Sequence, residues 1–354
     1  MSAPNSAFQE LSHIFRNRGN RILEIEILPP ALGPLLQDGC SIGITKKYLA
    51  QAFVAARWVF FAESSAQGED ERLGKKLDEV TMCSEIILLF DCEHLTACNW
   101  RKQRLQDMIQ RHDATSQASR ETLADSLHTE LTLMTTYVCS PLRRHTKSPT
   151  LWEHRLWVLR NLLLCESDET SGQPGSPGCE QSNPAMETAL RLWQQELVTV
   201  LRAGELHPRN YYAFNYIREV CGVLSQKVAD CDGRSTRFAR EGVDPTLDWC
   251  LAHTTDISGW MFLFYLLEAV PDDGVRQTTV RRAVRFARDV GWEGESLWTF
   301  VDLAVRTFDL AAVIQEELRP TQVLHPADGD DAPTAKTGWK VWLAMAKVCW
   351  AAGR

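Results

Sequence analysis

Apolar residues along most of this chain recur at the three- and four-residue intervals of amphipathic helices. In the stretch KSPTLWEHRLWVL, Trp152, Leu156 and Leu159 fall at i, i+4 and i+7, so that they share one face of a helix. Ser148 and Pro149 precede them, in the positions that an N-cap residue and a first-turn proline occupy. The pattern therefore predicts that a helix begins at this point.

The same arrangement, a short polar entry followed by an aromatic residue and helical apolar spacing, recurs along the chain. The copies are DCEHLTACNWRKQRL (a degenerate one), KSPTLWEHRLWVL, HPRNYYAFNYIREV, TTDISGWMFLFYLL and GWEGESLWTFVDL, with motif positions Cys98, Trp152, Phe214, Trp260 and Trp298. By helical spacing, the four aromatic side chains are expected in the core between stacked helices.

Each motif opens a predicted helix, and another predicted helix precedes it. Successive motif positions lie 54, 62, 46 and 38 residues apart, and the shortest interval approaches the roughly 34 to 47 residues of known two-helix repeats. Since one helix pair cannot cover its own hydrophobic face, such pairs stack on one another. The expected fold class is all-α: a TPR-like solenoid, or right-handed α–α superhelix, of about five helical hairpins.

The distribution of polar and helix-breaking residues predicts four segments. They are an N-terminal extended arm at residues 1–44, a helical solenoid at 45–319 with polar insertions at 166–184 and 225–244, a Pro/Asp-rich linker at 320–338, and a capping helix at 339–354. Within the arm, Leu23 to Leu28 alternates like a strand, and no other sheet is expected.

Composition narrows the function without naming it. A formal net charge of −8 with 24% charged residues argues against a nucleic-acid binder, which usually has a basic bias. The eleven cysteines form no C-x-x-C pair and no signal peptide is evident, so reduced thiols in a cytoplasmic protein are expected. No apolar run approaches the roughly 18 residues that span a membrane. Because H-E-x-x-H and paired Cys/His clusters are also absent, no metal is expected in this chain.

The motif copies resemble the P-x-N-Y-x-x-W-x-x-R repeat of protein prenyltransferase α subunits. KSPTLWEHRLWVL and HPRNYYAFNYIR are similar to its second and third copies, and GESLW is similar to the N-E-S-x-W string of its last copy. The resemblance covers roughly residues 77–308. The string LDEVTMCSEIILLFDCEHLTACNWRKQRL and the upstream EIEILP look most like a divergent branch of the family.

This resemblance implies a crescent of helical hairpins around a β subunit that carries the catalytic zinc, most of the isoprenoid pocket and the main catalytic residues. The divergent branch is associated with a third type of geranylgeranyltransferase, in which it pairs with the β subunit of the Rab enzyme. The implied function is that of the non-zinc α subunit in a heterodimer. Such a heterodimer transfers a geranylgeranyl group from its diphosphate to a C-terminal cysteine of an acceptor protein, possibly a SNARE.

The resemblance also implies a polar rim near the diphosphate, formed here by Lys147, Arg209, Tyr211 and Tyr212. Lys147 and Tyr211 are the implied catalytic residues, because they match a family lysine and a family tyrosine beside the diphosphate. Lys147 also precedes a predicted helix N-terminus, where an anion is favoured. From the residues alone, Lys147 can instead be a solvated loop lysine, and the tyrosines can pack across the hairpin.

The other motif residues are expected to be structural. They are Cys98, Arg101, Trp152, His154, Arg155, Asn210, Phe214, Trp260 and Trp298. Only Arg101 and Arg155 keep the motif arginine, since Ile217, Leu263 and Val301 replace it in the later copies. Two roles are open for these arginines: binding a carboxylate of the β partner, or a contact within their own turn or at a neighbouring helix C-terminus.

One rival function belongs to a different class. A helical-repeat protein can also be a non-enzymatic scaffold that holds a peptide or protein on its concave face, and the fold alone does not distinguish the two. Only the transferase hypothesis requires a zinc-binding β subunit.

Overall fold

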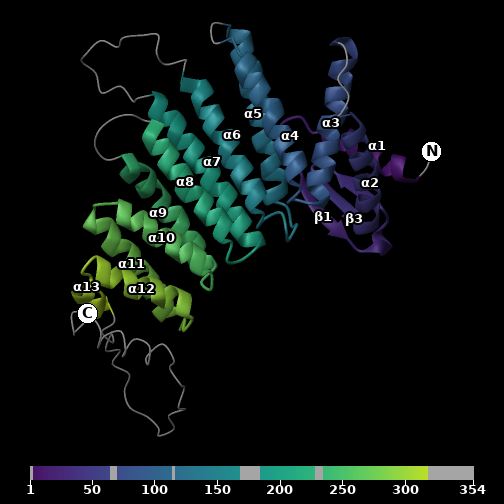
Figure 1. The fold of residues 1–354 in the computed structure, drawn as a ribbon. Helices are drawn as coiled ribbons and strands as arrows, with labels where there is room; N and C mark the ends of the chain where they lie inside the picture. Colours follow the sequence, from purple (N-terminus) through teal and green to yellow (C-terminus); the bar gives the residue numbers. More distant parts are fainter. Residues whose placement is uncertain (1–2, 64–69, 114–115, 168–183, 228–233, 318–354) are drawn as a thin grey trace. The chain divides into compact units, whose positions relative to one another are not determined.

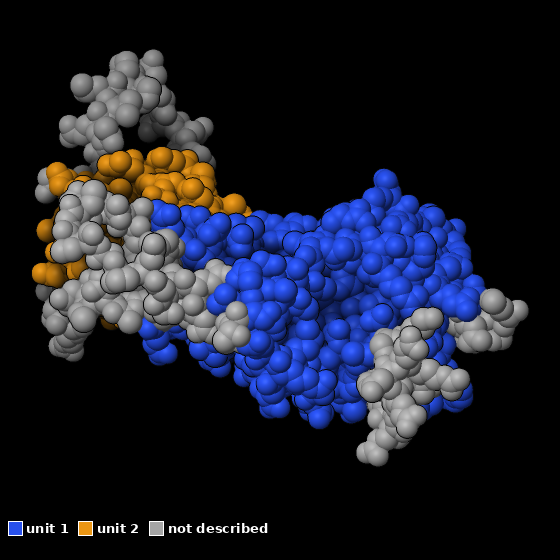
Figure 2. All heavy atoms as spheres, turned by 90° about the horizontal axis from the view of Figure 1, so that it is seen from above, with its two compact units in different colours: residues 1–227 blue, residues 228–354 orange. Residues whose placement is uncertain are grey.

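The computed structural model describes residues 3–63, 70–113, 116–167, 184–227 and 234–317. Most of these residues lie in helices (Figure 1), which confirms the expected all-α, helical-repeat fold. The chain divides into two compact units, residues 1–227 and 228–354 (Figure 2). The expected linker at 320–338 and capping helix at 339–354 fall outside the described residues, as does nearly all of the insertion at 166–184.

The first unit combines eight helices with a small sheet in its described part. The helices are α1 (Ala3–Asn17), α2 (Lys46–Glu63), α3 (Asp70–Phe90), α4 (Leu95–Arg111), α5 (Gln117–Val138), α6 (Pro149–Ser167), α7 (Pro184–Leu206) and α8 (Tyr211–Lys227). The strands are β1 (Glu24–Leu28), β2 (Leu35–Asp38) and β3 (Ser41–Thr45), with a short 3-10 turn, η1, at Pro30–Leu32.

The described part of the second unit is helical. Its helices are α9 (Arg234–Ala252), α10 (Ile257–Ala269), α11 (Asp273–Asp289), α12 (Glu295–Thr307) and α13 (Ala311–Glu317). Helices pack in sequential pairs: α3 with α4, α5 with α6 and α7 with α8 in the first unit, then α9 with α10 and α11 with α12 in the second. In each pair, the second helix carries a motif copy, as the sequence predicts.

The motif copies keep one register at the start of these second helices. The residue four positions before each motif position begins the helix; these residues are His94, Ser148, Asn210, Asp256 and Gly294. In the first four copies its side chain accepts a main-chain N–H of the first turn, which satisfies a donor that the helix itself cannot. The repeated motif in the sequence therefore marks the N-terminus of the second helix of each pair.

The motif tryptophans stabilise the turn that leads into their own helix. The indole Nε1–H groups of Trp152 and Trp260 donate to carbonyls six residues earlier, at 2.9 and 3.0 Å, and Trp298 does the same at 2.9 Å. All three, and Phe214, are at most 3% exposed, so the prediction that the motif aromatics are core residues is confirmed.

The extended arm expected at residues 1–44 is wrong. Helix α1 packs against α2 and α3, and β1 pairs in parallel with β3, which pairs antiparallel with β2. The sheet is held against α5, because the N–H groups of Leu23 and Ile25 donate to Thr136 and Ser140 hydroxyls at 3.1 and 2.9 Å. The two partner strands escaped prediction because β2, LLQD, has no apolar alternation and the alternation of β3, SIGIT, is limited to Ile42 and Ile44.

The insertion expected at 225–244 is also too long. Helix α9 begins at Arg234, within the expected insertion, and continues through Pro245. Phe238, Ala239 and Val243 are at most 2% exposed, so burial of this face outweighs the hydrogen bond that Pro245 cannot donate.

Helices α9 and α10 approach closely at Gly259, which makes a specific test of this packing possible. A Cβ added at Gly259 would overlap the indole ring of Trp249, so Gly259→Ala should lower the free energy of unfolding by about 1–3 kcal/mol. Gly222, inside α8, is the matched control: nothing lies within 4 Å of an added Cβ, and Gly222→Ala should stabilise by about 0.5–1 kcal/mol. Urea denaturation of both variants measures this; equal losses would contradict the close approach.

Candidate functional site

The two motif arginines each bind a glutamate on the first helix of the next pair. Arg101, on α4, donates to Glu130 of α5 through Nε at 2.8 Å and Nη2 at 2.5 Å. Arg155, on α6, makes the same two-bond contact with Glu196 of α7, with both distances at 2.8 Å. Each of the four residues is only 3% exposed. We call these two buried, bidentate pairs the arginine staples, because each joins successive helix pairs.

Each arginine also binds the first helix of its own pair. Nη1 of Arg101 donates to the Ser84 hydroxyl at 2.7 Å and to a main-chain carbonyl one turn earlier in α3. Nη1 of Arg155 donates to the Thr135 hydroxyl at 2.7 Å and to the carbonyl one turn earlier in α5. In both cases the hydroxyl itself donates to that same carbonyl. The two staples therefore share the same set of hydrogen bonds to the guanidinium.

Both roles expected for the motif arginines are wrong. The carboxylate comes from this chain rather than from a partner, and it lies on a different helix pair rather than in the same turn. Four of the five N–H donors of Arg101 have acceptors within hydrogen-bond distance, and its Nη2 also lies 3.6 Å from Glu85. At 3% exposure, this guanidinium is not accessible to a second protein.

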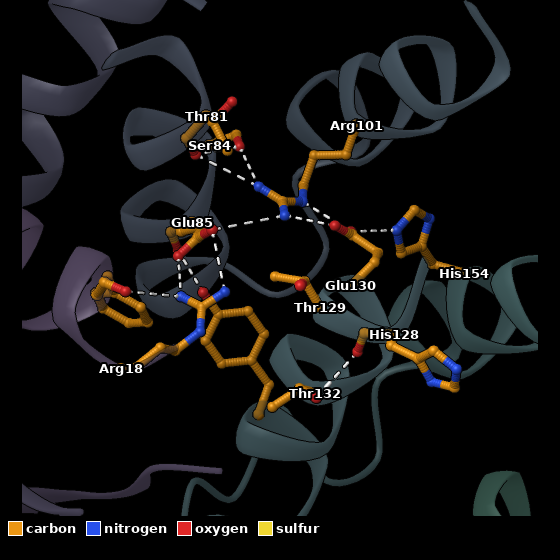
Figure 3. A network of polar contacts seen from close by, with 12 residues as sticks. Arg18, Thr81, Ser84, Glu85, Arg101, His128, Thr129, Glu130, Thr132 and His154 are labelled. Atoms are coloured by element: carbon orange, nitrogen blue, oxygen red, sulfur yellow. Dashed lines mark hydrogen bonds and ion pairs between the residues drawn. The ribbon is translucent and has the colours of Figure 1, made fainter. Parts of the chain in front are cut away.

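The first staple continues into a longer buried chain of charges (Figure 3). Arg18, which follows α1, forms an ion pair with Glu85 of α3. His154 Nε2, on α6, lies 2.7 Å from Oε1 of Glu130. We call these residues, Arg18, Glu85, Arg101, Glu130 and His154, the charge network; His154 and Glu130, on neighbouring helices, close one end of it.

In this network, each buried charged group is stabilised by a neighbouring group of opposite charge, which offsets the cost of burial. Burial opposes ionisation of Glu130, but Arg101 and His154 hold the pKa of this carboxyl well below its ordinary 4.5. Burial also opposes protonation of His154, but the Cys98 thiol and Glu130 raise its pKa above 6.5. Cys98, in the place of a motif aromatic, is 2% exposed and belongs to this packing.

The residues assigned to the diphosphate rim lie together at the entries to α6 and α8. Lys147 is half-buried and Arg209 is exposed, while Tyr211 and Tyr212 are 64% and 43% exposed. The two tyrosine rings meet edge to face, with centroids 6.1 Å apart. Neither ring is packed into the hairpin core, so the alternative in which the tyrosines simply pack across it does not describe them.

A side-chain hydrogen bond ties the two entry loops together. Asn210 caps α8 through Oδ1, and its Nδ2 donates to the Thr146 carbonyl at 2.7 Å, directly before Lys147. The pKa of His207 is lowered mainly by burial, and also by the nearby positive charges of Lys147 and Arg143. The sequence did not assign Arg143 and His207 to this site. We call Arg143, Lys147, His207, Arg209, Tyr211 and Tyr212 the basic rim.

The described residues offer neither a metal centre nor a membrane span. No group of three or more His, Cys, Asp or Glu side chains among them could hold a metal ion. None of the helices in the described part of the chain combines the length and the apolar character needed to cross a bilayer.

Comparison with known proteins agrees with the motif pattern and the helix pairs. Human protein prenyltransferase alpha subunit repeat-containing protein 1 is 28% identical over 143 residues, and its zebrafish counterpart is 30% identical over 132 residues. A Xenopus laevis relative, the 1-B form, is 23% identical over 207 residues. This chain is a relative of the protein prenyltransferase α-subunit repeat-containing proteins. In addition, the family described as the ECM9 middle domain matches residues 181–288.

The relationship covers part of each protein. The aligned regions span 40%, 36% and 56% of this chain, and 32%, 28% and 43% of the human, zebrafish and Xenopus relatives. The chain therefore spans less than half the length of the curated relatives that it matches. The alignment does not carry over the activity of the whole relatives to this chain.

Several residues of these sites escaped sequence reasoning. Glu85, Glu130 and Glu196 carry no motif of their own, although each interrupts the apolar face of a predicted helix. An acidic residue in that position, one helix away from a motif arginine, is the signal that could have found them. Tyr216, whose hydroxyl donates to Glu196 at 2.6 Å, belongs to the same set.

The second staple should be worth far more than an exposed pair on the same helix. Arg155→Met leaves Glu196 buried without its cation and should cost about 3–5 kcal/mol of unfolding free energy. Arg160→Met, which breaks the exposed pair with Glu219, should cost less than about 1 kcal/mol. Urea denaturation measures both, and Arg155→Met/Glu196→Leu should recover much of the loss. A small loss for Arg155→Met would show that the staple is dispensable.

The charge network also predicts how stability changes with pH. Because the folded pKa of His154 is raised above 6.5, its contribution is complete below that pH and is lost as the pH rises through the folded value. The stability advantage of the natural protein over His154→Gln should therefore shrink on the alkaline side. Glu130 acts oppositely: its contribution is present above 4.5 and is lost at the low pH where the folded carboxyl protonates. Denaturation across this range, with histidine NMR titration, tests both signs.

Proposed function

We propose that this chain is the non-zinc α subunit of a heterodimeric protein geranylgeranyltransferase. Its partner would be a Rab-type β subunit, which supplies the zinc and the main catalytic residues. The heterodimer would transfer a geranylgeranyl group from its diphosphate to a C-terminal cysteine of an acceptor protein, possibly a SNARE. The single observation that carries the proposal is the basic rim, in which cations and exposed phenols gather at one pair of helix entries.

The chemistry of the rim fits a diphosphate better than it fits a neutral peptide. Arg143, Lys147 and Arg209 are cations in a chain whose formal net charge is −8, so they attract an anion locally against the overall field. Lys147 also directly precedes the N-cap of α6, where the helix dipole adds to its charge. Tyr211 presents a neutral hydroxyl donor at the adjacent helix entry.

In the proposed reaction, this chain stabilises the leaving group rather than the nucleophile. Negative charge grows on the diphosphate as the acceptor thiolate attacks the isoprenoid carbon. A fixed cation at Lys147 would stabilise that charge more in the transition state than in the ground state, which accelerates the step. The Asn210 bond to the Thr146 carbonyl fixes the main chain directly before Lys147.

The rival proposal is that this chain is a helical-repeat scaffold with no enzymatic function. Complex formation with a β subunit distinguishes the two proposals. Co-expression with a Rab-type β subunit should give a one-to-one complex and raise the soluble yield, because a helical surface shaped for a partner is incompletely covered alone. A monodisperse protein that ignores this β subunit would favour the scaffold.

Within an assembled complex, Lys147→Ala should lower the single-turnover rate of prenyl transfer by about 10- to 100-fold, or roughly 1.4–2.7 kcal/mol. Lys147 is half-buried in a loop entry and makes no core contact that assembly requires, so the complex should still form. Lys47→Ala removes an exposed lysine of α2 and should leave the rate unchanged. An unchanged rate for Lys147→Ala in an intact complex would mean that the β subunit does the chemistry alone.

A further inference from the structure

A cavity of about 600 Å³ lies beside the charge network. It is bounded by the end of α1, the residues after it, and helices α3, α4 and α5. Arg18, Arg101 and Glu130 form part of its wall, together with Arg104, one turn after Arg101 on α4. The volume falls within the range of small-molecule sites, and the basic rim contributes no residue to it.

Arg104 is the feature of this cavity that packing does not explain. It is half-buried, and among the described residues it has no hydrogen-bond acceptor and no carboxylate within ion-pair distance. Burial and the charge of Arg101 lower the pKa of Arg104, so its own surroundings disfavour its charge. A guanidinium kept at this cost, with its donors unused, is poised for an anion that the protein itself does not provide.

The two buried carboxylates of the cavity wall are already paired with cations of this chain. Glu85 is paired with Arg18 and Arg101, and Glu130 is paired with Arg101 and His154. The cavity lining holds four arginines (Arg16, Arg18, Arg101 and Arg104) and four carboxylates (Asp78, Glu85, Asp125 and Glu130). Asp78 and Asp125 are exposed, so water screens their charge, although Asp78 still raises the pKa of Arg104.

The wall formed by α5 offers hydroxyl oxygens. Thr122, Ser126 and Thr129 follow one another at intervals of four and three residues and line the cavity. Thr122 and Ser126 each donate the hydroxyl hydrogen to a main-chain carbonyl of α5, and Thr129 lies 2.8 Å from both such a carbonyl and Oδ1 of Asn20. The oxygens of these hydroxyls can still accept a hydrogen bond. Such a row suits a ligand that carries hydroxyl groups beside its anionic group.

We infer that this cavity binds a small phosphorylated polyol, with its phosphate on Arg104 and its hydroxyl groups along α5. A phosphate suits the unpaired guanidinium of Arg104, because the planar fork of an arginine donates two parallel hydrogen bonds to phosphate oxygens. The same headgroup chemistry occurs in free sugar and inositol phosphates and in phosphoinositide lipids. The inference does not depend on prenyl transfer, because the basic rim is a separate site.

Calorimetric titration of the full chain tests the inference with inorganic phosphate, ribose phosphate and inositol phosphate as soluble probes. Sedimentation with phosphatidylcholine vesicles, with and without phosphatidylinositol phosphate, tests the lipid source. A polyol phosphate should bind more tightly than inorganic phosphate, and Arg104→Gln should weaken it by about 10- to 100-fold, as expected for losing a charged hydrogen-bonding partner. Arg111→Gln, at the exposed end of α4, is the matched control and should bind normally.

Thermal unfolding without ligand keeps this test independent of folding. Because its surroundings disfavour the charge of Arg104, Arg104→Gln should unfold at the same temperature as the natural protein or at a higher one. Binding to soluble probes, to vesicles or to both supports the inference and identifies the source. Binding of no phosphorylated probe, equal affinity for inorganic phosphate, or undiminished affinity in Arg104→Gln would each overturn it.

Discussion

The buried arginine staple is the interaction on which the first unit depends. Taking a guanidinium and a carboxylate out of water costs several kcal/mol per ion, and only close geometry with further hydrogen bonds offsets that cost. Arg101 and Arg155 meet this demand in the same way, with two bonds to a glutamate of the next helix pair and two to the first helix of their own pair. Each staple therefore fixes three helices at once, and a shifted helix would leave buried charges unpaired.

In the later copies of the motif, an apolar side chain fills the position between the helices that the arginine occupies in the first two. Ile217, Leu263 and Val301 replace the arginine, and each is fully buried. A buried ion pair is often no more stable than apolar side chains of similar volume, so these copies need no compensation. What the arginine adds is selectivity, because only a helix that presents a glutamate at the right position can follow.

The parts that sequence predicted well are those with a local cause. Helix starts follow from N-cap residues such as Ser148 and Asn210, and the buried face follows from apolar spacing around Trp152 and Trp260. The parts that it missed depend on contacts distant in sequence. Strands β2 and β3 form because they pair with each other and with β1, and Glu130 and Glu196 matter because an arginine on another helix reaches them. The rim residues were found through family resemblance, and only the folded chain adds Arg143 and His207 to them.

The repeat motif and the basic rim meet at a single main-chain carbonyl. Thr146 accepts a hydrogen bond from the indole of Trp152, which stabilises its own helix entry, and another from Asn210, which begins the next motif helix. Lys147 follows directly in the chain, so its backbone is fixed by core residues of two successive repeats. Side chains that are buried for packing thereby position one that is available for chemistry. For this reason, the conformation of the rim is set by the spacing of the repeats, while its charge remains free to change without disturbing the fold.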